Sequence, residues 1–191
     1  MATVHFILGI ICTAFISRID VPDRHLLAKS GSVRSSCMNE QNCRRRLVQL
    51  AVAEIGVREK TNRNDGKRVE EYLSVVNLRK GQPYCSAFIS WLFAREGFTK
   101  PRTGWSPDLF PQARLARSAL PANIIGIYFP GMKRIAHTGM IEKMIGSWCQ
   151  TVEANTSLTG SRSGDGVYRK LRHLRTIYRI SDWVSPERAG R

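Results

Sequence analysis

One cysteine, Cys85, lies at a position where a thiol is expected to be activated, the start of a predicted helix. Cys85 follows a proline-containing turn at 81–84 and opens an apolar stretch, 85–96, whose hydrophobic residues recur at helical spacing. The first N–H groups of a helix lack partners within it and its dipole favours an anion, so this thiol should have a lowered pKa. Thiolate is the nucleophilic form of cysteine. Free cysteines are also common as small buried hydrophobic residues, so position alone leaves both interpretations open.

A histidine and two polar residues on neighbouring predicted strands supply groups that could act with this thiol. His137 lies within 134–143, and Glu153 and Asn155 lie at the end of 148–154 and just beyond it. In a hairpin with an even register sum, His137 faces Glu153 or Asn155, because paired residues point to the same side of a sheet. Either residue would hold one imidazole nitrogen and leave the other for a thiolate. A slip of one residue would turn both away, and a structural histidine is the alternative.

The elements that must position these groups are helices first and strands afterwards. Helices are expected at 44–55, where Gly56 ends the first of them, at 69–76 and at 85–96. Prolines interrupt residues 99–123, which should cross the surface near the site. This order predicts an α+β fold with N-terminal helices packed on an antiparallel sheet. The expected strands are 124–129, 134–143, 148–154, 166–172 and 175–180.

The order and spacing of five segments resemble the CHAP family, the cysteine, histidine-dependent amidohydrolases/peptidases. The resemblance covers residues 46–180. Two positions depart from the family pattern: Tyr84 stands where tryptophan commonly precedes the cysteine, and residues 121–124 replace a turn that usually contains Gly-Asp-Ile. The segments that carry the resemblance are 53–59 (AEIGVRE), 69–73 (VEEYL), 81–91 (GQPYCSAFISW), 137–141 (HTGMI) and 153–156 (EANT).

The resemblance implies a papain-like fold and hydrolysis of an amide bond in peptidoglycan, by an amidase or an endopeptidase. By motif position, Cys85 would be the nucleophile and His137 the general base. Glu153 would be the third catalytic member, and Asn155 would be a supporting polar residue. The thiolate would attack the carbonyl, and the histidine would protonate the leaving amine and then activate water.

Three further residues are expected to contact the substrate: Gln82, Tyr84 and Trp105. The backbone N–H of Cys85 would hold the oxyanion, with Gln82 or Tyr84 nearby. Some family members bind calcium in a loop before the cysteine, but residues 62–66 offer few acidic ligands here. No metal and no cofactor are therefore predicted.

The net charge narrows the choice of partners. Thirty Lys+Arg against fifteen Asp+Glu give the 191-residue chain a charge of +15 and a pI ≈ 10.3. Such a surface attracts polyanions, among them nucleic acid and an acidic cell envelope. We expect peptidoglycan as partner, non-specific attraction to anionic envelope surfaces and no specific nucleic acid, because no nucleic-acid motif is recognised. A rival nucleic-acid-binding function would use the basic stretch Arg169, Lys170, Arg172, His173, Arg175 and Arg179, with Tyr168 and Tyr178 interleaved.

The first residues predict export. Residues 6–16 form an apolar run that is short for a membrane span and typical of the central region of a signal peptide. We therefore expect a signal peptide at 1–17, a linker at 18–45, a CHAP-like catalytic domain at 46–183 and a tail at 184–191. The protein would be periplasmic or secreted, and monomeric. A catalytically inactive wall-binding module with the same organisation is a second rival function.

The spacing of two cysteines is compatible with an oxidising compartment. Cys37 and Cys43 are close enough in sequence to close a small disulfide loop there. The chain has no CxxC pair and its four histidines are scattered, so a structural zinc site is not expected.

Overall fold

The computed structural model describes residues 40–159 and 164–186, all within a unit that spans Arg34–Arg191. The expected signal peptide at 1–17 and most of the expected linker lie outside the described residues, as do residues 187–191 of the expected tail. Each helix of the described part is too short or too polar to cross a bilayer.

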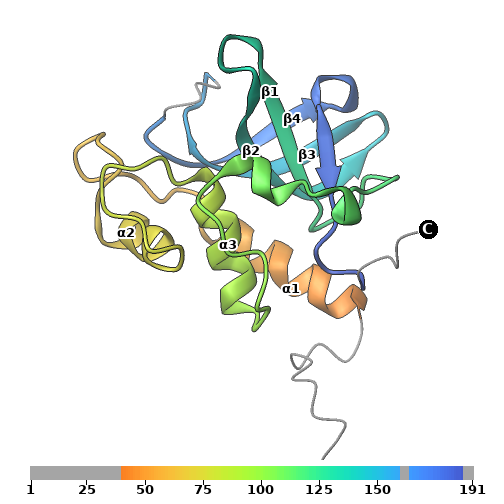
Figure 1. Ribbon diagram of the computed structural model, residues 1–191, viewed down its shortest axis with the longest axis horizontal. Coiled ribbons are helices and arrows are strands. Elements are labelled where there is room, and N and C mark those ends of the chain that lie inside the picture. Colours follow the sequence, from red (N-terminus) through yellow and green to blue (C-terminus); the bar gives the residue numbers. More distant parts are fainter. Residues whose placement is uncertain (1–39, 160–163, 187–191) are drawn as a thin grey trace, which may run out of the picture. The chain divides into compact units, whose positions relative to one another are not determined.

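Three helices precede the sheet. They are α1 (Glu40–Ala53), α2 (Lys67–Ser74) and α3 (Cys85–Arg95). The helix α3 is buried from Cys85 to Phe93, because α1, α2 and the sheet contact it from different sides (Figure 1). Tyr72 of α2 packs edge-on against Phe88 and Trp91 of α3, with ring centroids 5.2 and 5.1 Å away. The start of α3 is therefore held rigidly by its surroundings.

The five strands form one antiparallel sheet in the order β4-β3-β2-β1-β5. The predicted α+β fold, with helices before an antiparallel sheet, is confirmed. The helices α1 and α3 pack against β2, and α3 also contacts β3 (Figure 1). The strands are β1 (Ile124–Phe129), β2 (Arg134–Ile145), β3 (Trp148–Thr156), β4 (Gly166–His173) and β5 (Arg179–Ser181).

Successive residues of the inner strands enter two different apolar clusters. Ile124 and Met140 belong to the main core that contains α3. Their neighbours Ile125 and Ile141 join a second cluster with Cys149. Alternation along a strand sends successive side chains to opposite faces, so both faces of the central strands are covered. The site on β2 and β3 therefore lies on a well-packed scaffold.

The first helix begins earlier than expected. It starts at Glu40 rather than Arg44, so residues 40–45, which fall within the expected linker, are helical. Arg44 ties this first turn to the end of the domain: its guanidinium pairs with Glu40 one turn earlier and with Asp182 after the last strand. Arg44 also donates to Ser185, so the first residues of the expected tail pack with the domain.

The last strand is shorter than predicted. Residues 175–180 do not form one strand: a 3-10 turn occupies Leu174–Thr176, and pairing resumes at Arg179. The backbone N–H of Arg175 donates to His173 Nδ1 at 3.1 Å, and this local bond stabilises the turn. Side-chain capping of this kind competes with a sheet ladder.

Candidate active site

Cys85 begins α3, and only 5% of the residue is exposed. Tyr84 precedes the helix without a side-chain cap, and the N-terminus of a helix favours a negative charge. Two hydroxyls adjoin the sulfur: Sγ lies 3.6 Å from Ser106 Oγ and 3.9 Å from Ser86 Oγ. Burial alone would raise the pKa of Cys85, but the neighbouring His137, together with both serines, lowers the pKa to about 7.

His137 lies in β2 and turns one ring nitrogen toward a carboxylate. Its Nε2 is 2.8 Å from Oε2 of Glu153. The other nitrogen, Nδ1, is buried without a hydrogen-bond partner among the described residues. It is the nitrogen left for Cys85, since the two groups shift each other's pKa. Burial would lower the pKa of His137, but Cys85 and Glu153 raise it to about 9. The pair therefore favours thiolate beside imidazolium.

Glu153 is a buried carboxylate whose oxygens are all occupied. Arg172 donates to both of them, at 2.8 Å to Oε1 and 2.6 Å to Oε2. Thr151 adds a hydroxyl bond to Oε1 at 2.7 Å, and His137 binds Oε2. Burial would raise the pKa of Glu153, but the bonds to Arg172 and His137 hold it well below its usual range. The carboxylate therefore stays charged and can orient the imidazole.

The pairing of β2 with β3 puts His137 and Glu153 on the same side of the sheet. Near the turn the register has an odd sum, as in Met144↔Cys149, and a bulge before Lys143 changes it to the even sum of Met140↔Val152. Continued toward His137, the even register places Gly139 opposite Glu153. A Cβ on Gly139 would lie 2.5 Å from Glu153 Cγ, so the glycine leaves the space that this side chain occupies.

Asn155 makes no hydrogen bond to the imidazole of His137. It has φ 58° and is the extra residue in a bulge between Ala154 and Thr156 of β3. The bulge interrupts the alternation that would have kept Asn155 on the face of Glu153. Its Nδ2 instead donates to Asn64 Oδ1 at 2.7 Å. Of the two partners that the sequence left open, Glu153 binds His137, and Asn155 joins the loop before α2.

Two of the three expected substrate contacts line the cleft in which Cys85 lies. Gln82 and Trp105 lie along it, together with Arg134 of β2. Tyr84 does not: it is fully buried, and its hydroxyl donates to Glu59 Oε1 at 3.1 Å. The expectation for Tyr84 is corrected, because its ring belongs to the core and anchors the residue before Cys85 rather than facing the cleft.

Four further residues of the site were not identified from the sequence. Ser86 and Ser106 share a hydroxyl bond of 2.9 Å beside the thiol, and Ser106 comes from the proline-interrupted segment. In the sequence, Arg172 belongs to the basic stretch of the rival nucleic-acid-binding function, and Arg134 has no predicted role. A signal existed only for Arg172: a buried carboxylate requires a cationic partner, and β4 was expected beside β3. Nothing in the spacing indicates Ser106 or Arg134.

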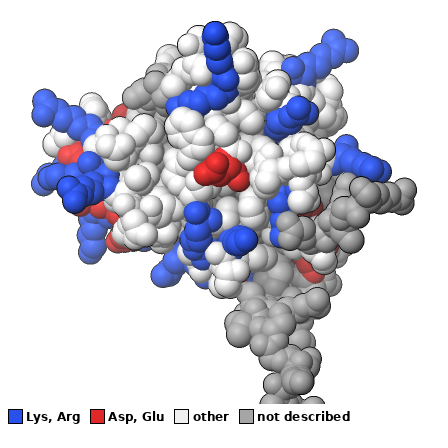
Figure 2. All heavy atoms as spheres, viewed as in Figure 1, with Lys and Arg blue, Asp and Glu red and all other residues white. Residues whose placement is uncertain are grey.

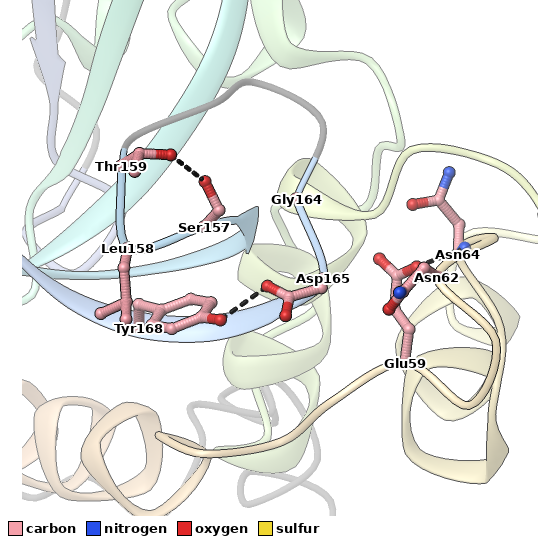
Figure 3. A pocket seen from close by; sticks show the side chains of 9 residues that line it. All are labelled: Glu59, Asn62, Asn64, Ser157, Leu158, Thr159, Gly164, Asp165 and Tyr168. Carbon is pink, nitrogen blue, oxygen red and sulfur yellow. Dashed lines mark hydrogen bonds between the residues drawn. The ribbon is translucent and has the colours of Figure 1, made fainter.

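A second pocket lies between the loop before α2 and the start of β4 (Figure 3). Glu59 and Asp165 are its carboxylates, and both accept internal bonds: Glu59 from the Asn64 backbone at 2.7 Å, Asp165 from the Tyr168 hydroxyl at 2.6 Å. In the described parts of the chain, no group of three or more His, Cys, Asp or Glu is placed to hold a metal ion. Asn64, which accepts the bond from Asn155, also lines this pocket.

The basic residues of β4 point to different partners. Arg169 pairs with Glu142 at 2.7 Å, and Arg172 is bound to Glu153. Lys170 donates to the backbone carbonyl oxygens of residues 157 and 158. Figure 2 shows Lys and Arg dispersed over the face in view, with Asp and Glu between them. These three cations are therefore engaged within the domain and do not make a common phosphate-binding platform.

The cysteines differ in state. Cys85 and Cys149 are free thiols, and burial raises the pKa of Cys149 to about 11. Cys43 is disulfide-bonded, while its expected partner Cys37 lies outside the described residues. Cys85 is thus the free thiol with a lowered pKa in the described part of the chain.

Comparisons of the chain with protein-family models, with curated proteins and with solved structures gave no match.

Proposed function

We propose that this chain is a cysteine hydrolase of the CHAP type, with a papain-like arrangement, that cleaves an amide bond in the peptide of peptidoglycan. One observation carries the proposal. A thiol with a lowered pKa at the start of α3 lies beside a histidine whose far nitrogen is bound to the buried carboxylate of Glu153. Nucleophile, base and orienting group in this order are the arrangement of acyl-transfer enzymes.

Acylation begins from the thiolate of Cys85 and the imidazolium of His137. The sulfur attacks the scissile carbonyl carbon, a C–S bond forms and the carbonyl oxygen becomes an oxyanion. The backbone N–H of Cys85, at the helix start, is suited to stabilise that charge. The C–N bond then breaks as Nδ1 donates its proton to the leaving amine, which departs neutral. A thioester and a neutral imidazole are left.

Deacylation uses the same groups in reverse. Neutral His137 takes a proton from water, and the resulting hydroxide attacks the thioester carbonyl. The C–S bond breaks, the acid product leaves, and thiolate and imidazolium are restored. Glu153 keeps Nε2 protonated throughout and steadies the charged ring, while Arg172 prevents the carboxylate from taking the proton. One water is consumed for each amide bond.

The peptidoglycan part of the proposal rests on two supports. The five segments that resemble the CHAP family contain Cys85, His137 and Glu153, and the geometry groups these side chains. The charge of +15 suits a substrate within an anionic envelope. A nucleic-acid-binding protein would have no use for a thiolate held by a histidine and a buried carboxylate. An inactive module would not be expected to keep a thiol of lowered pKa.

The test is release of soluble fragments from purified peptidoglycan, followed by mass analysis of the fragments. The intact protein should release fragments with one new amine end and one new carboxyl end, and the masses identify the bond. Cys85→Ala should release none while keeping the circular dichroism of the parent. Cys149→Ala is the matched control and should stay active. Release by Cys85→Ala, or a clean digest with no new amine ends, would refute the proposal.

A further inference from the structure

A cation stacked on an aromatic ring lies in the cleft beside Cys85. The guanidinium of Arg134 is 3.9 Å from the ring centroid of Trp105, and both residues line the cleft that contains the thiol. Trp105 is 49% exposed, so the ring presents one face to Arg134 while remaining open to solvent. Stacking of this kind orients a planar guanidinium and leaves its N–H edges for a ligand.

Arg134 lacks a carboxylate partner within the described residues. Its Nη1 donates a hydrogen bond to the backbone carbonyl oxygen of Ile135, at 3.0 Å, and the guanidinium makes no ion pair with a described residue. The residues lining the cleft include no Asp or Glu. Arg172, the arginine bound to the catalytic carboxylate, is by contrast neutralised by Glu153. The cleft therefore has a positive charge without an internal counter-charge.

We propose that Arg134, oriented by Trp105, binds a free carboxylate of the peptide substrate next to the scissile amide. The proposal rests on the proposed function and narrows it, because it selects peptides with an acid over those with a carboxamide at that place. Arginine binds carboxylates through two parallel N–H bonds, and a carboxamide presents one N–H₂ group in place of an acceptor oxygen. Replacing the carboxylate by a carboxamide removes the negative charge and leaves the shape of the group almost unchanged.

We take this carboxylate to be that of the second residue of the peptide stem. An amidase would cut between the lactyl group and L-alanine, and an endopeptidase would cut within the stem or cross-bridge peptide; that residue lies close to the first bond and to the stem bonds on either side of it. In peptidoglycan it is either D-glutamate, with a free α-carboxylate, or D-isoglutamine, with a carboxamide. A pair of soluble muropeptides that differ only in this group therefore provides the probe.

The experiment measures binding of the two muropeptides by titration calorimetry, using full-length Cys85→Ala so that cleavage does not interfere. Cys85→Ala without a further substitution, the parent in this experiment, should bind the D-glutamate peptide about tenfold or more tightly than the D-isoglutamine peptide, as expected for a charge-assisted pair. Arg134→Gln should reduce this ratio to about one by loss of affinity for the acid. Arg134→Lys should keep part of it. Arg179→Gln is the matched control, because Arg179 also stacks on an aromatic ring, Tyr178, and does not line the cleft.

Equal affinity of the parent for both peptides, or an unchanged ratio in Arg134→Gln, would overturn the proposal. Absence of binding to either peptide would overturn it as well. Cleavage of the same peptides by the unmodified protein is scored separately. A carboxylate preference in binding without cleavage would retain the Arg134 site and reject the hydrolase, so the two failures are distinct.

Discussion

The thiol of Cys85 and the imidazole of His137 share one proton near neutral pH, and the site decides where it resides. In an unfolded chain, with ordinary values of 9.0 and 6.5, the thiol would keep it. In the folded protein the pKa of Cys85 falls to about 7 and that of His137 rises to about 9. Between these values the sulfur is a thiolate and the ring is charged, which is the form that can start acylation.

The lowered pKa predicts selective alkylation of Cys85. Iodoacetamide should label it at a rate that rises through about pH 7, the pKa of the thiol. Cys149 should react far more slowly because burial raises its pKa to about 11. Peptide mass spectrometry of timed samples gives both rates. In His137→Ala the rise should move to higher pH, and equal labelling of the two cysteines in folded protein would contradict the prediction.

The bond from His137 to Glu153 predicts an order of effects on hydrolysis. His137→Ala should lower kcat/KM most, by about 10,000-fold, because both proton transfers are lost. Glu153→Gln should lower it by about 100-fold, since the ring keeps its place with weaker charge stabilisation. Asn155→Ala should cost less than about tenfold, because Asn155 is hydrogen-bonded to Asn64 and not to the ring. Circular dichroism checks folding, and a larger loss in Asn155→Ala than in Glu153→Gln would disprove the order.

At the scale of elements, the hairpin of β2 and β3 aligns base and carboxylate through an irregularity. A regular ladder extended from the turn would keep an odd register sum and send His137 and Glu153 to opposite faces. The bulge before Lys143 shifts the register by one and brings them to one face. Gly139 then leaves room for the carboxylate to cross to the imidazole. Both features belong to pairs of strands, not to single residues.

A methyl group at Gly139 should disconnect this pair. Gly139→Ala would place Cβ 2.5 Å from Glu153 Cγ and 3.1 Å from the Val152 carbonyl oxygen, and Glu153 is held in place by its bonds to Arg172. We expect kcat/KM to fall by about 100-fold or more and the pKa of His137, followed by NMR, to decrease. Gly131→Ala is the control, because nothing lies within 4 Å of its Cβ. An unchanged His137 pKa in Gly139→Ala would show that the carboxylate adapts.

At the scale of the whole molecule, His137 and Cys85 both contribute to stability, and their contributions depend on pH in opposite directions. The raised pKa of His137 gives stability that is full below pH 6.5 and is lost as pH rises through about 9. The lowered pKa of Cys85 gives stability that is full above pH 9.0 and is lost as pH falls through about 7. Because the two trends oppose each other, this pair should leave the free energy of unfolding nearly constant around neutral pH.

The lowered pKa of Glu153 predicts that the protein loses stability in acid. Its folded pKa lies below the ordinary value of 4.5, so its contribution is full above that value and is lost as pH falls through the folded pKa. Urea titrations over a pH series should show stability falling on acidification below about pH 4.5. Glu153→Gln should flatten this fall and cost about 3 kcal/mol at neutral pH, because Arg172 loses its partner.

The matched control for this change is Glu142→Gln, which removes the carboxylate from a more exposed pair. The Arg169 side chain of that pair is 41% exposed, so solvent screens the interaction and the cost should be about 0.5 kcal/mol. Equal costs for Glu142→Gln and Glu153→Gln would mean that the buried carboxylate does not anchor the fold. The same acid slope in Glu153→Gln as in the parent would assign the slope to other carboxylates.

The sequence by itself determined the features that repeat along the chain or follow from one position. Apolar spacing predicts α3 and places Cys85 at its first turn, and alternation predicts the inner strands. The observed bounds of β1, Ile124–Phe129, coincide with the prediction. Order of helices and strands was enough for the α+β class. These inferences succeed because helix periodicity and strand alternation are local properties of the backbone.

Only the tertiary structure decided which groups meet at the thiol. Bulges at two places in β3 and its partners bring Glu153 to His137 and turn Asn155 toward Asn64, and no local pattern marks a bulge here. Ser106 comes from a proline-interrupted segment without periodicity, and Arg172 leaves the basic stretch to neutralise a buried carboxylate. Register, bulges and ion pairing depend on neighbouring strands and on the free energy of burying charge, which appear only when the elements pack.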